Sequence, residues 1–218
     1  PMIRQKLTPN YTLGCKRILL SDDYLPTFNR PNVALETTAI REISANAIHL
    51  VDGKTIPVDV IIFSTGFDAA EINTDAKVLG IKGRELFSEW AISGMEAFKG
   101  TTFSGYPNFT YLLGPNTGLG HSSVLHIMES QMPYILQYLD LLDRQGANGY
   151  LDVKANAQNT YNAELQAKFQ GTVWASGCKS WYLNSQGKNT TLYPRLTRAF
   201  RHRMAKFDAE NYAQVIQQ

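Results

Sequence analysis

The sequence predicts an α/β fold that handles a dinucleotide, and two similar segments support this prediction. Residues 58–68 read VDVIIFSTGFD, in which an apolar and mostly β-branched run is followed directly by a Ser-Thr-Gly turn. Such a run is typical of a buried parallel strand. Residues 110–121, TYLLGPNTGLGH, again combine a strand, a glycine-rich loop and a helix start. Loops at the carboxyl ends of strands are where α/β sheets bind nucleotides.

The N-terminal third predicts loops and then an antiparallel meander. Pro9, Pro26 and Pro31 interrupt residues 1–31. Further along, Asp52-Gly53 separates two extended runs, which is a strong hairpin signal. The predicted strands are residues 33–36, 40–43, 47–51 and 55–58, and they lead into the buried strand 60–63.

The rest of the chain predicts one further strand and three helices. The strand is residues 111–113, after a mixture of short helix and loop. The first helix runs from about Ser122 to Arg144, and Pro133 should kink or split it. Its apolar stripe consists of Val124, Met128, Met132, Ile135, Leu139 and Leu142. The other helices are expected across residues 155–169 and from Thr197 towards Val215.

The composition is that of a globular protein and gives no reason to expect nucleic acid or a membrane as a partner. The 218 residues are 44% hydrophobic, and 21 basic against 19 acidic residues give a net charge of +2. No apolar run reaches the roughly 18 residues of a membrane span. Neither Cys15 nor Cys178 lies in a redox or zinc spacing, so we expect reduced thiols in a cytoplasmic protein, with a disulfide as the alternative. The histidines show no metal-binding spacing either.

Three short segments are candidates for binding or catalysis. The loop around Gly118 precedes the long helix, where unpaired N–H groups and bare backbone can accept a flat ring or a phosphate. An ordinary helix-entry turn is the alternative. Lys16-Arg17 is either a solvated basic pair or an arginine at a reacting oxyanion beside a phosphate-binding lysine. Trp181 is either a core residue or a cofactor contact.

An ordered set of motifs resembles the Baeyer–Villiger-type flavoprotein monooxygenases, within the wider flavin-containing monooxygenases. The similarity covers nearly the whole chain. The motifs are GCKR at 14–17, Tyr24, TFNRPNV at 27–33, STGFDA at 64–69, GYPNF at 105–109, LGPN at 113–116 and SWY at 180–182.

This resemblance implies two Rossmann-like domains, an FAD domain and an NADP domain inserted into it. Residues 1–66 would be the C-terminal part of the NADP domain. Residues 67–218 would be the C-terminal part of the FAD domain, with a helical C-terminal region. The G-x-G-x-x-G fingerprints that bind FAD and NADP are not found in the 218 residues. We therefore expect this chain to be the C-terminal part of a longer protein.

The resemblance also implies an activity. The whole protein would use FAD, NADPH and O₂ to insert one oxygen atom into a small-molecule ketone. The glycine loop carries GLGH where the best-known ketone oxidisers carry Ser-Pro, which leaves the substrate class open. The alternatives are a sulfur- or nitrogen-oxidising flavin monooxygenase and an interaction module without a cofactor.

The resemblance finally assigns roles to individual residues. Arg17 would be the catalytic arginine, and Lys16 would favour the 2′-phosphate of NADP. Trp181 would face the cofactor or the substrate. The remaining predicted cofactor contacts lie in the two strand-end loops, and they are Thr65, Gly66, Asn116, Thr117, Gly118, Leu119 and Gly120. No metal site is expected.

Overall fold

The computed structural model describes residues 2–66, 74–120, 122–177 and 179–216, and the chain forms two compact units. The first unit comprises Pro1–Thr12 and Ile18–Phe67, and the second comprises Leu13–Arg17 and Asp68–Gln218. The segment Leu13–Arg17 therefore belongs to the second unit, although the first unit flanks it in the sequence. The expected assignment of the two parts to an NADP and an FAD domain stays a prediction.

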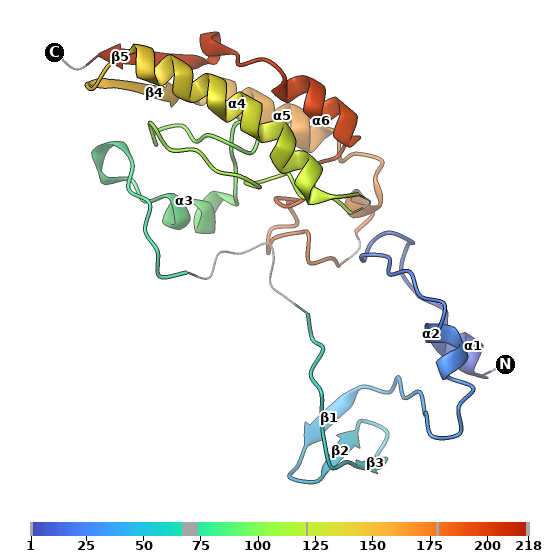
Figure 1. Cartoon of the computed structure of the whole chain (residues 1–218). Helices are drawn as coiled ribbons and strands as arrows, with labels where there is room; N and C mark the ends of the chain where they lie inside the picture. The colour runs from blue at the N-terminus through green and yellow to red at the C-terminus, as the bar shows by residue number, and fades with distance from the viewer. Residues whose placement is uncertain (1, 67–73, 121, 178, 217–218) are drawn as a thin grey trace. The chain divides into compact units, whose positions relative to one another are not determined.

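The first unit contains two short helices and a small antiparallel sheet (Figure 1). The sheet has the strand order β1-β2-β3, and Gly53 closes the turn between the last two strands with a φ of 90°. Its amide donates to Leu50 O at 3.1 Å. The predicted meander is thus confirmed. The elements are α1 (Met2–Leu7), α2 (Tyr24–Thr27), β1 (Ile40–Ile43), β2 (Ala47–Leu50) and β3 (Thr55–Pro57).

The strands predicted outside this meander are not observed. Residues 60–63 are extended but unpaired among the residues described, and Val60 and Ile62 are 77% and 85% exposed. Residues 33–36 and 111–113 are likewise not strands. A strand is stabilised by hydrogen bonds to a neighbour and by cover on its faces, and the described part of the chain supplies neither to residues 60–63.

The second unit contains helices, a two-stranded sheet and long loops, and its longest helix confirms the prediction. That helix, α4, spans Val124–Arg144 as one element that continues through Pro133. Ser123 caps it, because its Oγ accepts from Leu125 N at 3.2 Å. The other elements are η1 (Ile81–Gly83), α3 (Leu86–Ser93), β4 (Gly149–Val153), α5 (Ala155–Ala167), η2 (Val173–Ala175), α6 (Thr197–Met204), η3 (Ala209–Asn211) and β5 (Tyr212–Ile216).

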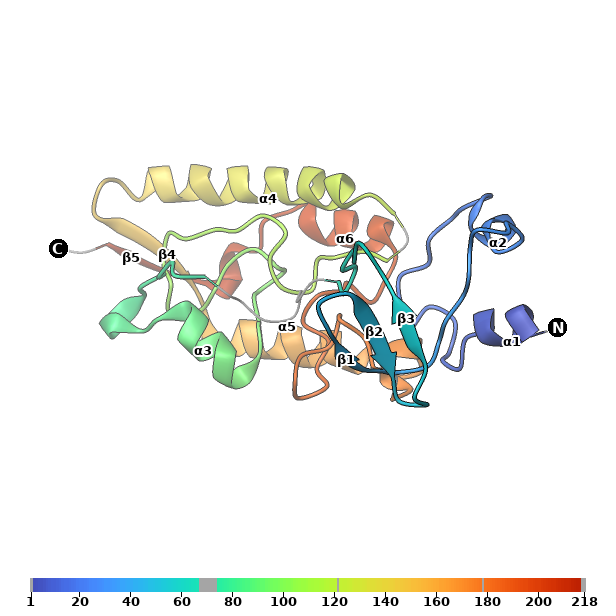
Figure 2. The ribbon, with the colours of Figure 1, turned by 90° about the horizontal axis from the view of Figure 1, so that it is seen from below.

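Helices α4, α5 and α6 and the β4–β5 pair all contribute side chains to the main core of this unit. In Figures 1 and 2, α4 and α6 run side by side, and β4 and β5 pair at the C-terminal end of α4. Phe200 and Met204 of α6 are fully buried against this core. The third predicted helix therefore ends at Met204. Tyr212–Ile216 forms a strand instead, because it pairs with β4 in an antiparallel register.

The predicted apolar stripe of α4 is wrong for several of its members. Val124, Met132 and Leu139 are 40–46% exposed, whereas the buried face includes Ile127, Gln131, Tyr134 and Tyr138. The polar atoms of this face have partners, as when the Tyr134 hydroxyl donates to Asp208 Oδ1 at 2.5 Å. Hydrogen bonding makes the burial of these polar groups tolerable.

Candidate functional site

The glycine loop, residues 114–120, is held by backbone hydrogen bonds to the segment 189–193. Asn116 N donates to Thr190 O and Gly118 N donates to Thr191 O, both at 2.8 Å. The Asn116 side chain adds hydrogen bonds from its Nδ2 to the carbonyls of Asn189 and Leu192, at 2.8 and 3.0 Å. Asn116 and the neighbouring Thr117 are 2% and 1% exposed. The loop is therefore a fixed part of the core of the unit.

The glycines of this loop meet different constraints. A Cβ on Gly118 would lie 2.8 Å from Thr191 O, and one on Gly114 would lie 2.6 Å from Gly100 O. A Cβ on Gly120 would meet nothing within 4 Å. Neither Gly118 nor Gly120 has a positive φ, whereas Asn116 does, at 57°. Close approach of the protein's own backbone is thus enough to require glycine at 118.

A cavity of about 270 Å³ lies against the loop. Its walls are mostly apolar. Two hydroxyl oxygens on its lining residues, Thr190 Oγ1 and Thr191 Oγ1, are buried without a hydrogen-bond partner in the described structure. Each such group costs about 1–3 kcal/mol unless a ligand or water pairs with it. The lining consists of Trp90, Met95, Tyr111, Leu113, Gly114, Pro115, Thr117, Gly118, Val124, Thr190 and Thr191.

The predicted catalytic segment is anchored to the second unit by Cys15. This residue is 1% exposed, and its Sγ lies 3.6 Å from Lys179 O. Cys15 is disulfide-bonded, so the expectation of a reduced thiol is wrong for this residue. Cys178, the other cysteine of the chain, lies outside the described residues. Lys16 and Arg17 follow this anchor directly, and both are exposed.

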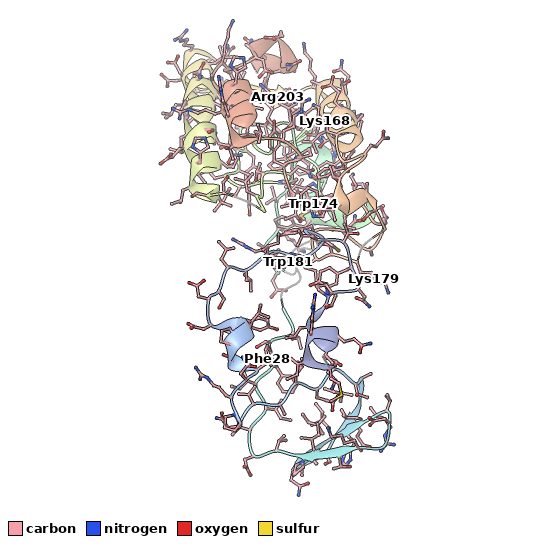
Figure 3. All side chains as sticks on the ribbon, turned by 90° about the vertical axis from the view of Figure 1, so that its right-hand side faces the viewer. Phe28, Lys168, Trp174, Lys179, Trp181 and Arg203 are labelled. Carbon is pink, nitrogen blue, oxygen red and sulfur yellow. The ribbon has the colours of Figure 1, made fainter. Side chains whose placement is uncertain are left out.

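Trp181 lies at the exposed end of a row of aromatic rings. It is 38% exposed, and its ring centroid is 5.3 Å from that of the buried Tyr182. Tyr182 meets Trp174 edge-on at 6.3 Å, and Trp174 meets Phe169 at 6.1 Å. Figure 3 labels Trp174, Lys179 and Trp181 within one region of the second unit. The segment that carries Trp181 thus begins beside the Cys15 anchor.

The other predicted cofactor contacts do not line this cavity. Thr65 and Gly66 belong to the first unit, where both are exposed and Gly66 has a φ of 92°. Leu119, within the glycine loop, is buried at 5% exposure. His121, which follows the loop, lies outside the described residues. In the described ranges, no group of side chains could hold a metal ion, and no helix is long and apolar enough to cross a membrane.

Comparisons with known proteins agree with this architecture. No family model matches the chain. A Baeyer–Villiger monooxygenase of Pseudomonas aeruginosa is 46% identical over 97% of this chain, and one of Streptomyces coelicolor is 40% identical over 97%. The chain is homologous to Baeyer–Villiger monooxygenases. It spans only about 40% of the length of these curated relatives.

Solved structures of related monooxygenases match the fold. The structure of OTEMO in complex with FAD and NADP matches 99% of this chain with a TM-score of 0.81 and 25% identity. An oxidised steroid monooxygenase bound to NADP matches 100% of it, also with a TM-score of 0.81 and 25% identity. The chain covers 41% and 42% of those two proteins. The expected α/β class and the likeness to Baeyer–Villiger monooxygenases are thereby confirmed.

The sequence does not identify several residues that line the cavity or support the loop beside it. Thr190 and Thr191 lie in a segment that shows no periodic pattern, so nothing in the sequence singles them out. The sequence does not identify Gln131 either, because a polar residue on a helix is expected to face solvent. Its Nε2 donates to Gly100 O at 2.9 Å, and its Oε1 accepts from Leu113 N at 3.0 Å. Gln131 thereby fixes the residues that lead into the glycine loop.

Proposed function

We propose that this chain is the C-terminal part of a cytoplasmic, FAD- and NADPH-dependent monooxygenase that inserts one oxygen atom from O₂ into a ketone. The observation that carries the proposal is the cavity beside the glycine loop. Its walls are mostly apolar, and two of the residues that line it, Thr190 and Thr191, have buried hydroxyls without a hydrogen-bond partner in the described structure. An isoalloxazine ring has the same character, since it is a flat ring with apolar faces and polar edges. The residues present therefore fit FAD.

The residues around this site would have separate tasks. The chemistry of oxygen transfer belongs to the flavin when it is bound. Gly114 and Gly118 let the loop pack directly against the carbonyl oxygens of Gly100 and Thr191, and Asn116 and Gln131 would keep the cavity wall rigid. Rigid placement matters because reacting groups must be held in a productive geometry.

Lys16 and Arg17, the exposed basic pair, would act through their positive charges. Arg17 carries a permanent positive charge with its donors in a planar fork, which suits an oxyanion that develops during attack on a carbonyl carbon. Lys16 would pair with the 2′-phosphate of NADPH as a point charge. Trp181, at the exposed end of its aromatic row, would contact the cofactor or the substrate. Thr65 and Gly66 are proposed as further cofactor contacts.

The test is a product analysis on the full-length protein. Purified protein should show flavin absorbance, consume NADPH with ketones and release esters or lactones. A panel of cyclic and linear ketones should be run beside matched organic sulfides and amines. Oxygenation of the sulfides or amines alone would overturn the ketone assignment. A colourless protein that does not take up FAD would overturn the cofactor assignment as well.

A further inference from the structure

The tight turn of residues 98–101 contains two consecutive residues with a positive φ. Lys99 has a φ of 54° and Gly100 has a φ of 65°, and Thr101 N donates to Phe98 O at 3.0 Å. Positive φ at both central residues is characteristic of a type I′ turn, which favours Asn-Gly there. Glycine adopts this conformation freely, whereas lysine is disfavoured in it. The contacts of the Lys99 side chain therefore have to compensate for the strain of its backbone.

This turn packs directly against the glycine loop. A Cβ on Gly114 would lie 2.6 Å from Gly100 O, and a Cβ on Gly100 would overlap Thr117 Cγ2. Tyr111 N, just before the loop, donates to Thr101 O at 2.8 Å. Gly114 and Thr117 line the cavity of about 270 Å³, so a shift of the turn would move the wall of that cavity.

The Lys99 side chain is a buried cation with two polar partners. Lys99 is 7% exposed, and its Nζ lies 2.9 Å from Asp208 Oδ2 and donates to Arg203 O at 3.1 Å. Arg203 O is one of the last carbonyls of α6, where a lysine is favourable. Nζ also lies 4.7 Å from the ring centroid of Tyr134. A charge buried this deeply is stable only when it is paired, so these contacts fix the side chain in one position.

Asp208, the carboxylate that pairs with Lys99, belongs to a buried hydrogen-bond network. Its Oδ1 accepts from the Tyr134 hydroxyl at 2.5 Å. The Tyr134 hydroxyl lies 3.1 Å from that of Tyr212, which in turn lies 2.8 Å from Thr102 Oγ1. Thr102 directly follows the turn. The network thus holds the turn at two points, Lys99 and Thr102, and connects it to α4 through Tyr134.

We propose that Lys99 is a positioning residue for the cavity beside the glycine loop. Its ion pair with Asp208 holds the strained turn in place, and the turn supports the cavity wall at Gly114 and Thr117. Lys99 does not line that cavity, so it acts through the turn and the loop. The role of the cavity as the flavin site rests on the proposed function. Loss of the ion pair should loosen the loop before it unfolds the unit.

Hydrogen exchange of the 218-residue chain, followed by mass spectrometry, tests the positioning role without a cofactor. In Lys99→Met and in Asp208→Asn, the amides of residues 111–118 should exchange about tenfold faster than in the parent, because the turn supports them. The amides of α5 bond within their own helix and should keep their parent rates. Faster exchange throughout the second unit, with no excess at residues 111–118, would assign Lys99 to global stability and overturn the proposal. Parent rates in both variants would overturn it as well.

Lys82 provides a matched control, because it is another lysine with a positive φ. Its φ is 59°, it is exposed, and it does not line the cavity. Asparagine tolerates this conformation better than lysine, so Lys82→Asn should keep or raise the melting temperature. Lys99→Asn gains the same tolerance but is too short to reach Asp208. It should therefore melt at a lower temperature and exchange faster at residues 111–118, and equal behaviour of the two variants would overturn the role of the ion pair.

The full-length protein shows whether the effect reaches the proposed flavin site. Lys99→Met should shift the visible absorption bands of bound FAD and weaken FAD binding by about tenfold. Lys99→Arg, which keeps the charge, should restore part of both. An unchanged flavin spectrum together with unchanged FAD affinity in Lys99→Met would overturn the positioning role. A parent protein that takes up no FAD would instead refute the proposed function, and the exchange experiment would still decide whether Lys99 positions the loop.

Discussion

At the scale of single residues, the buried Cys15 fixes the backbone of a short loop that also carries the exposed Arg17, the proposed catalytic arginine. Cys15 fixes the backbone of the loop to the second unit, and Gly14 gives the loop a φ of 88°. Arg17, two residues later, keeps its guanidinium exposed. Its neighbours therefore set the position of Arg17, while the side chain stays available to a substrate.

Arg17→Ala in the full-length protein should leave FAD bound and remove oxygenation of ketones. Losing one donor to a developing oxyanion typically lowers the rate by about 10²–10³. Oxygenated product should be quantified beside NADPH consumption and the ratio of flavin to protein absorbance. Arg30→Ala serves as a control, because Arg30 is an exposed arginine of the first unit. Unchanged yields of product in Arg17→Ala would contradict the catalytic assignment.

At the scale of elements, local signals were predictable and pairings between distant segments were not. The bounds of α4 and the Asp52-Gly53 hairpin depend on nearby residues, and the sequence predicts both. The buried face of α4 depends on distant partners, since Gln131 and Tyr134 are buried only because residues such as Gly100 and Asp208 satisfy them. For the same reason, nothing local distinguishes β5 from a continued helix or marks Thr190 and Thr191 as cavity residues.

The two glycines of the loop make a matched pair for testing its role. Gly118→Ala should destabilise the chain by about 1–3 kcal/mol, because the new Cβ would overlap Thr191 O. Gly120→Ala should change stability by less than about 0.5 kcal/mol, because its Cβ would meet open space. Urea or thermal unfolding of the 218-residue chain measures both. Equal stability of the two variants would contradict the close approach of the loop to residues 189–193.

At the scale of the whole molecule, the first unit exposes apolar residues that sequence reasoning places in a buried strand. Val60, Ile62 and Phe63 are all more than two thirds exposed, as are Leu19 and Leu20. Five large apolar side chains in two short runs exceed the scattered exposure of an ordinary surface. The run at residues 58–63 has the composition of a parallel strand covered on both faces, so we infer that a neighbouring strand and further layers cover it in the full-length protein.

The last prediction concerns cofactor binding by the 218-residue chain alone. We expect it not to bind FAD tightly, although the cavity at the glycine loop fits the flavin ring. The pyrophosphate of FAD requires a G-x-G-x-x-G turn at a helix start, and the 218 residues contain no such fingerprint. Flavin fluorescence during titration of the chain with FAD and, separately, with riboflavin is the measurement. Because riboflavin lacks the pyrophosphate, the two ligands should bind with similarly low affinity. A sub-micromolar affinity for FAD would mean that this chain holds the pyrophosphate by other residues.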